Sequence, residues 1–221
     1  HAIELSATGF QVTTSYTGTN GNGNTHIYMA IRRPMKTPEA GTEVFAVDQF
    51  TLGQTSPAFA SGFPVDMAIT RNVPGVANTD LATRLLGAGI LRTNNTDAWG
   101  ASGSYSFDYM DGWMNLNWAS TNYWSWMFKR APGFMDVVCA TGASTTNQRV
   151  AHNLTVAPEL IIFKGRNRAT YWNVYFGSID TSLFLNDTQA FQTNVNKWGT
   201  ALPTNTDFGI NSNKIDLDSF N

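Results

Sequence analysis

Residues 124–128 read Trp-Ser-Trp-Met-Phe, an apolar run that is typical of a β-strand. Strand alternation places Trp124 and Trp126 on one face, with Tyr123 and Ser125 on the other. Similar short runs recur along the chain, separated by turns rich in Gly and Asn. They cover residues 10–13, 27–31, 44–47, 67–69, 136–139, 160–163, 172–176 and 183–185. Since the only helix candidate is residues 80–86, the sequence predicts an all-β protein.

Short sequences recur in the same order at nearly one spacing. Residues 128–132 resemble 31–34, and residues 158–164 resemble 64–70. Trp198-Gly199 matches Trp99-Gly100, and Phe208 matches Phe107. A fixed spacing indicates internal repetition, and a repeat of about 95 to 100 residues suits a β-sandwich. We therefore expect Trp198 to superpose on Trp99, and Pro158 on Pro64.

This repetition predicts the domain organisation. Residues 1–33 are expected to be the C-terminal end of a preceding repeat, residues 34–131 one β-sandwich repeat, and residues 132–221 a second. The counterpart of the strand at residues 124–128 would fall beyond Asn221, so the second repeat is expected to be truncated, with an edge that something else covers. Because His1 rather than Met opens the chain, we expect it to be a piece of a longer polypeptide.

Residues 126–138 (Trp-Met-Phe-Lys-Arg-Ala-Pro-Gly-Phe-Met-Asp-Val-Val) and 150–164 carry a resemblance to a known family. They resemble a repeat module of virion-associated proteins of tailed bacteriophages, which are similar to tail-fibre or receptor-binding components. The resemblance covers residues 123–210 well and residues 34–122 more weakly. It implies tandem β-sandwiches of the jelly-roll or lectin-like type, in the virion, after assembly in the host cytoplasm. It supplies no catalytic residues.

Composition excludes several classes of partner. The 14 Lys and Arg against 16 Asp and Glu leave a formal net charge of -2, without a basic cluster for nucleic acid. Apolar runs are far shorter than a membrane-spanning helix, so we expect no membrane insertion. The 27 Thr and 21 Asn indicate a surface made polar by neutral side chains. A long β fibre with such a surface must protect its strand edges, which predicts a homo-oligomer, as a trimer, packed against other virion proteins.

Aromatic residues between positions 113 and 126 suggest a ligand site. Flat rings flanked by amides can stack on sugar rings and bond their hydroxyls. Turn-forming neighbours favour Trp113 and Trp118 as the exposed rings, with Asn115 and Asn117 beside them. Trp126 is expected in the core, since it lies at the centre of an apolar strand. The alternative is that all these rings fill a core or a subunit seam.

Paired carboxylates raise an alternative function. Asp108 and Asp111 lie among aromatic residues, as in many sites that cleave sugars, which would make the chain a polysaccharide depolymerase, a glycoside hydrolase or lyase of a phage tail. The simpler interpretation is that both are turn aspartates bonded to their own backbone before Gly112. Asp216 and Asp218 could share a strand face and bind calcium, but the pattern lacks the glycine and distal glutamate of an EF-hand.

The remaining reactive residues are expected to be structural. His152 precedes an apolar stretch, and we expect its ring to bond a turn carbonyl. Cys139 is the only cysteine, and its strand-like surroundings predict a buried side chain. No two histidines have the spacing of metal ligands, so no metal and no cofactor are predicted. The sequence therefore predicts a non-enzymatic virion structural protein, a fibre, spike or capsid decoration that contacts host-surface glycan.

Overall fold

A computed structural model describes residues 3–6, 9–12, 36–50, 57–73, 75, 77–87, 89–101, 105–115, 122–193 and 196–215. The chain separates into two compact units, His1–Pro34 and Met35–Asn221. In the first, strands β1 (Ile3–Ser6) and β2 (Gly9–Val12) form an antiparallel pair. The predicted strand at residues 27–31 lies outside the described residues. Strands dominate throughout, which confirms the all-β prediction.

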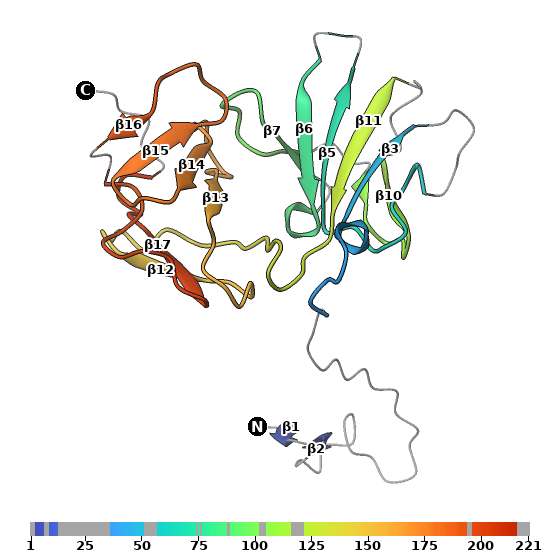
Figure 1. The fold of residues 1–221 in the computed structure, drawn as a ribbon, viewed down its shortest axis with the longest axis horizontal. Helices are drawn as coiled ribbons and strands as arrows, with labels where there is room; N and C mark the ends of the chain where they lie inside the picture. Colours follow the sequence, from blue (N-terminus) through green and yellow to red (C-terminus); the bar gives the residue numbers. More distant parts are fainter. Residues whose placement is uncertain are drawn as a thin grey trace. The chain divides into compact units, whose positions relative to one another are not determined.

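The second unit begins with a two-layered β-sandwich, called here the first sandwich. Its larger sheet has the order β3 (Phe45–Gln49), β11 (Tyr123–Phe128), β5 (Met67–Asn72), β6 (Thr79–Thr83), β7 (Gly89–Arg92) and β8 (Gly100–Ala101). Figure 1 shows β3, β11, β5 and β6 side by side. The smaller sheet has the order β4 (Phe59–Ala60), β10 (Gly112–Asn115) and β9 (Tyr105–Ser106).

The core of the first sandwich lies between these sheets. The larger sheet contributes mainly small or flexible side chains, among them Ala68, Ala82 and Met127, while the smaller sheet contributes Phe59 and Trp113. Small residues on one layer leave room for large rings on the other, and this complementarity closes the sandwich. Strand alternation puts the larger residues of β5 and β11 on the opposite face of the six-stranded sheet.

A second group of strands, called here the second sandwich, has its own core. One sheet has the order β13 (Leu160–Phe163), β14 (Asn173–Phe176), β15 (Thr181–Phe184) and β16 (Gln192–Thr193). The other pairs β12 (Gln148–Ala151) with β17 (Asp207–Ile210). Both sheets contribute to one buried cluster, formed by Val150, Ile161, Tyr175, Trp198, Phe208, Ile210 and Ile215.

The two sandwiches share part of their strand pairing. In the first, β4 pairs with β10 while β5, β6, β7 and β8 follow one another across a sheet; in the second, β12 pairs with β17 while β13 to β16 do the same. Phe59 pairs with Trp113 in the first sandwich, and Val150 pairs with Phe208 in the second. Val150 comes 91 residues after Phe59, and Phe208 comes 95 residues after Trp113. Tandem repetition would produce this correspondence, but it matches Phe208 with Trp113, whereas the sequence predicted a match with Phe107. The repeat itself, its boundaries at residues 33/34 and 131/132, and the jelly-roll or lectin-like assignment remain predictions.

The predicted equivalence of Trp99 and Trp198 is not seen in this topology. Trp99 directly precedes β8, whereas Trp198 follows β16, the strand that occupies the same place in the second sandwich. Trp99 is 37% exposed and Trp198 only 1%. Phe191, which directly precedes β16 and is also exposed, occupies the position that corresponds to Trp99. Pro64 and Pro158 do occupy corresponding places, each shortly before the first strand of a four-strand meander.

Two local predictions were wrong. Residues 80–86 form the end of β6 and a single 3-10 turn, Arg84–Leu86, because β6 pairs with β5 as far as Thr83. Residues 136–139 form no strand, since Asp136 accepts hydrogen bonds from the backbone N–H groups of Val137 (2.9 Å) and Asn153 (2.8 Å). That arrangement leaves Cys139 exposed instead of buried.

Two loops join the sandwiches within the second unit. The Thr170 N–H donates to the Thr96 carbonyl at 3.0 Å, and the Trp99 N–H to the Arg166 carbonyl at 2.8 Å. Lys164 Nζ lies between the loops and donates to the carbonyl of Thr96 at 3.2 Å and to Thr170 Oγ1 at 3.1 Å. No helix in the described part of the chain is long and apolar enough to cross a membrane.

Candidate functional site

The predicted glycan platform does not form around Trp113. This side chain is fully buried, at 0% exposure, and its ring stacks between aromatic neighbours, with centroids 5.8 Å from Phe59 and 5.2 Å from Phe107. Its indole Nε1–H donates to Ser125 Oγ at 2.9 Å. The prediction that Trp113 is an exposed ring was therefore wrong, because the inward-facing serine on β11 gives the indole both space and a hydrogen-bond acceptor.

The other residues predicted for this platform are only partly placed. Asn115 ends β10, where its backbone pairs with Tyr105 on β9. Trp118 and Asn117 lie outside the described residues. With Trp113 in the core, a glycan site at these four positions would have to depend on residues that the structure does not describe.

Trp126 was predicted to lie in the core, but it faces away from it. Ser125 and Met127 on β11 are buried in the first core, so Trp124, Trp126 and Phe128 point to the opposite face and are only half-buried. The predicted alternation along this strand is confirmed. The prediction that Trp126 belongs to the core was wrong, because the alternate residues Ser125 and Met127 fill it.

Neighbouring strands extend this apolar face across the sheet. Trp126 lies between Val47 on β3 and Ile69 on β5, and Ile69 in turn lies beside Leu81 on β6. Phe128 lies between Phe45 and Met67 in the next row. We call this surface the aromatic sheet face, and it consists of Phe45, Val47, Met67, Ile69, Leu81, Trp124, Trp126 and Phe128.

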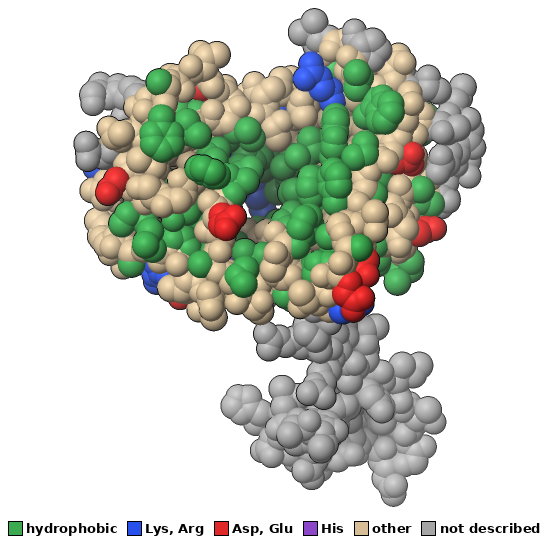
Figure 2. All heavy atoms as spheres, in the orientation of Figure 1, with side chains coloured by type: hydrophobic (Ala, Val, Ile, Leu, Met, Phe, Trp, Pro, Cys, Tyr) green, Lys and Arg blue, Asp and Glu red, His purple; other side chains and the backbone are tan. Residues whose placement is uncertain are grey.

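The aromatic sheet face is substantially open to solvent. Val47 is 45% exposed and Phe45 37%, and the Phe45 and Phe128 rings contact each other at a centroid distance of 5.1 Å. Figure 2 shows hydrophobic side chains gathered over the strands β5, β6 and β11. Arg71, opposite Trp124 on β5, gives the last row of this face an exposed charge. An apolar centre with a polar margin is the ordinary composition of a protein interface.

Sequence reasoning missed the members of this face outside β11. A usable signal was present in the small residues at alternate positions: Ala68 on β5, Ala82 on β6 and Ser125 on β11 are all buried. Where small side chains face a core, the larger residues between them must face outward.

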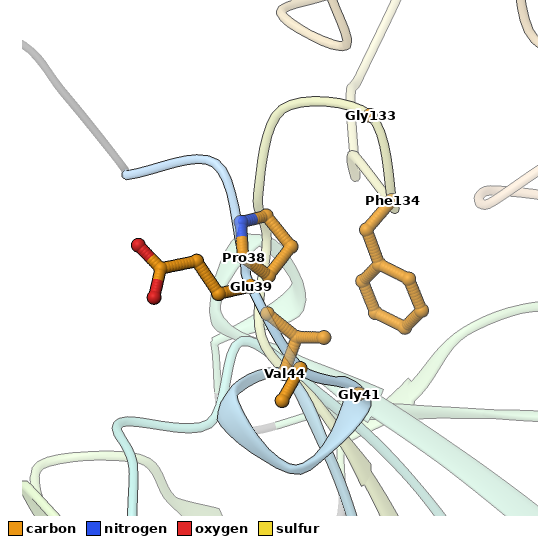
Figure 3. A pocket seen from close by; sticks show the side chains of 7 residues that line it. Pro38, Glu39, Gly41, Val44, Gly133 and Phe134 are labelled. Atoms are coloured by element: carbon orange, nitrogen blue, oxygen red, sulfur yellow. The ribbon is translucent and has the colours of Figure 1, made fainter.

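A shallow hollow of about 220 Å³ lies between Pro38, Gly41, Val44 and the turn at Gly133 and Phe134. Figure 3 shows the Phe134 ring facing Val44 across this hollow, while the Glu39 carboxylate points away from Phe134. Glu39 is paired instead with Lys36 at 2.9 Å. The hollow therefore offers apolar contact without a directed polar group.

His152 has the structural role predicted for it. The ring is buried, with Nε2 3.2 Å from the Thr204 carbonyl oxygen and Nδ1 accepting the Leu154 N–H at 3.2 Å. These partners assign the neutral tautomer with its proton on Nε2. The ring joins the start of the segment after β12 to the turn before β17, and both ring nitrogens are engaged in doing so.

The two aspartates predicted as alternatives for catalysis occupy turns. Asp108 Oδ2 accepts the Ser106 hydroxyl at 3.3 Å, while the Asp111 backbone carbonyl accepts the N–H of Ser61 at 2.7 Å and of Gly62 at 3.1 Å. Both side chains are exposed. Asp216 and Asp218 lie outside the described residues, and among those that are described no three potential metal ligands cluster.

Two carboxylates have shifted pKa values, each for a structural reason. Burial within the six-stranded sheet raises the pKa of Asp80, against the opposing effect of Arg92. Hydrogen bonds from Arg149 and Thr204 lower the pKa of the half-buried Asp207. The Asp207 carboxylate accepts the Thr204 hydroxyl at 2.8 Å and an Arg149 Nε–H at 3.1 Å, which fixes the turn before β17.

Comparisons with curated proteins and with solved structures gave no match. One family does match, over residues 92–219, and its description is "Domain of unknown function (DUF7483)". The matched region runs from the end of β7 through the second sandwich and includes β11. Since it covers more than half of the sequence, the chain belongs to the DUF7483 family.

Proposed function

We propose that this protein is a structural component of a bacteriophage virion, in a fibre, spike or capsid decoration, and that the aromatic sheet face is its assembly surface. The observation that carries the proposal is the row Val47, Trp126, Ile69 and Leu81, which is apolar across four adjacent strands and only partly buried.

Physical chemistry supports an assembly role for such a face. Contiguous apolar surface on a folded protein commonly marks a site for another macromolecule, since burying it releases about 25 cal/mol per Å² of apolar area. Interface centres are enriched in Trp, Phe and Met, the residue types of β11 and its neighbours. Strands also hold these side chains in fixed positions, so little conformational freedom is lost on association.

The phage virion part of the proposal depends on the resemblance carried by residues 126–138 and 150–164. A surface that is polar through Thr and Asn and carries few charges suits long-lived packing between subunits, because little charge has to be desolvated. The preferred partners are copies of the chain itself, as a trimer, and other virion proteins. Host-surface glycan is a further proposed ligand of the assembled particle.

Immunogold electron microscopy tests the virion proposal. An antibody raised against the purified chain should label intact phage particles at one repeated position on the appendages or shell. Antibody against an unrelated cytoplasmic phage protein is the control. If the chain is abundant in infected cells while purified particles contain none of it by mass spectrometry, it is not a virion component.

Light scattering on designed variants tests the surface. Val47→Lys should reduce the oligomer mass measured for the wild type at micromolar concentration, because a charge would be buried at the centre of the interface. Val156→Lys is the matched control, since Val156 is 48% exposed and lies after β12, outside the aromatic sheet face. Equal masses for both variants and the wild type would show that another surface holds the subunits.

A further inference from the structure

A lysine and an asparagine are in close contact beside the core of the second sandwich. Lys197 Nζ lies 2.6 Å from Asn173 Oδ1, below the range of about 2.7 to 3.2 Å that is usual for an N–H···O hydrogen bond. Asn173 is the first residue of β14 and is 1% exposed, while Lys197 lies between β16 and β17 and is half-buried. The contact joins two segments that are 24 residues apart in the sequence.

The Asn173 side chain is held in one orientation. Its Nδ2 donates to the Ile215 carbonyl at 2.8 Å and to the Tyr171 carbonyl at 3.3 Å. Because a carbonyl oxygen can only accept, these two bonds assign the amide nitrogen to that side and the amide oxygen to the side of Lys197. The amide carbon, Cγ, is therefore one bond beyond the oxygen that the lysine amine contacts.

The Lys197 side chain is also held in place. The Phe184 ring, on β15 directly opposite Asn173, has its centroid 4.4 Å from Nζ. The Asn211 N–H donates to the Lys197 carbonyl at 2.7 Å, and the next residue, Trp198, is 1% exposed. A fixed backbone and an apolar ring beside the amine keep it against the amide and limit the access of water to the pair.

We propose that Lys197 and Asn173 form an intramolecular isopeptide bond, which links β14 covalently to the segment between β16 and β17. The Nζ–Cγ bond forms and the Cγ–Nδ2 bond breaks. Starting from the lysine ammonium, Nζ gives up two protons and the departing nitrogen takes up two, so the products are a secondary amide and an ammonium ion. Nothing is oxidised or reduced, and no further reactant is consumed.

The surroundings of the pair favour this reaction. Groups held together within one molecule react as if each were present at about 10⁵–10⁸ M, which can make a slow amide exchange proceed unaided. The carbonyl oxygens of Ile215 and Tyr171 already accept hydrogen bonds from the nitrogen that must leave. A cross-link between residues 173 and 197 would also restrict the unfolded chain and so stabilise the second sandwich. The inference is independent of the aromatic sheet face.

Mass spectrometry of the intact, purified chain tests the bond. The wild type should weigh less than its sequence predicts by one ammonia molecule. Trypsin should not cut after Lys197, so residues 169–214 should appear as a single peptide with the same deficit. Lys197→Arg and Asn173→Ala should each have the full mass.

Lys164→Arg is the matched control. Lys164 is also a half-buried lysine of the second sandwich, but its Nζ contacts backbone carbonyls, among them that of Gly165 at 2.9 Å, and the Thr170 hydroxyl at 3.1 Å. This variant should keep the deficit of one ammonia molecule. Circular dichroism establishes which variants are folded.

Each outcome decides the proposal. A deficit that is located to residues 169–214 and lost in Lys197→Arg supports it. A deficit that persists in Lys197→Arg would show that an asparagine loses ammonia without the lysine, and would overturn it. A wild type that keeps its full mass after prolonged incubation at mildly alkaline pH, where more of the amine is uncharged, would show a hydrogen bond only. The wild-type mass and peptide map do not depend on whether a variant folds.

Discussion

The Trp113 indole donates its N–H to Ser125 across the first sandwich, at a distance of 2.9 Å, and both residues are 0% exposed. This bond joins β10 in the smaller sheet to β11 in the larger. It also sets the facing of β11, since an inward Ser125 requires Trp124 and Trp126 to point outward.

Ser125→Ala should therefore destabilise the protein by about 1 to 3 kcal/mol, because it removes the side-chain oxygen that accepts the buried Trp113 indole N–H. Urea unfolding followed by tryptophan fluorescence measures the change. Trp113→Phe removes the donor, so Ser125→Ala introduced on that background should cost clearly less than on the wild type. Equal costs in both backgrounds would show that the bond contributes nothing to stability.

The positions of the strands were largely predictable from the sequence, but which face of each strand is buried was not. Short apolar runs between Gly- and Asn-rich turns are local signals, and they located β5, β11, β13 and β14 within a few residues. Which face of a strand is buried depends on the opposing sheet. Tryptophan is far more hydrophobic than serine, so the sequence pattern placed Trp126 in the core. In the structure Ser125 occupies the core instead.

Turn chemistry explains most of the remaining errors. The residues around Cys139 form no strand because a single carboxylate, Asp136, draws the nearby backbone N–H groups into hydrogen bonds. The aromatic sheet face was missed for a different reason, since it brings together residues 45, 69, 81 and 126, which only strand pairing makes neighbours.

Gly112 should tolerate no side chain, unlike Gly100. A Cβ at position 112 would lie 2.1 Å from the Phe59 carbonyl oxygen, a backbone atom of the paired strand, whereas a Cβ at position 100 would meet nothing within 4 Å. We expect Gly112→Ala to cost about 1 to 3 kcal/mol or more through forced displacement of β4. Gly100→Ala should change the unfolding free energy by less than about 0.5 kcal/mol. Chemical denaturation of the two variants makes the comparison, and similar midpoints would contradict it.

Acid should weaken the turn that Asp207 holds. Its folded-state pKa lies below the ordinary value of 3.8, chiefly through the Arg149 hydrogen bond, so the unfolded chain takes up this proton first as the pH falls. The stabilisation is therefore complete above that ordinary value and is lost as the pH drops through the lower folded-state pKa. Melting curves should give Asp207→Asn a lower melting temperature than the wild type at pH 7. The difference between the two melting temperatures should narrow in strong acid. An equal difference at pH 7 and in strong acid would contradict this prediction.

Substitutions of two adjacent residues on β11, Trp126 and Met127, should affect association and stability differently. Met127 is 0% exposed within the first core, so Met127→Ala should cost about 2 to 5 kcal/mol of unfolding free energy. Trp126 faces outward, and Trp126→Ala should cost less than Met127→Ala while lowering the oligomer mass in light scattering, because it removes the central ring of the aromatic sheet face. Met127→Ala, measured at a temperature where it remains folded, should keep the wild-type mass. If Trp126→Ala unfolds the protein more readily than Met127→Ala and leaves its association intact, then the outward face of this sheet serves the fold rather than a partner.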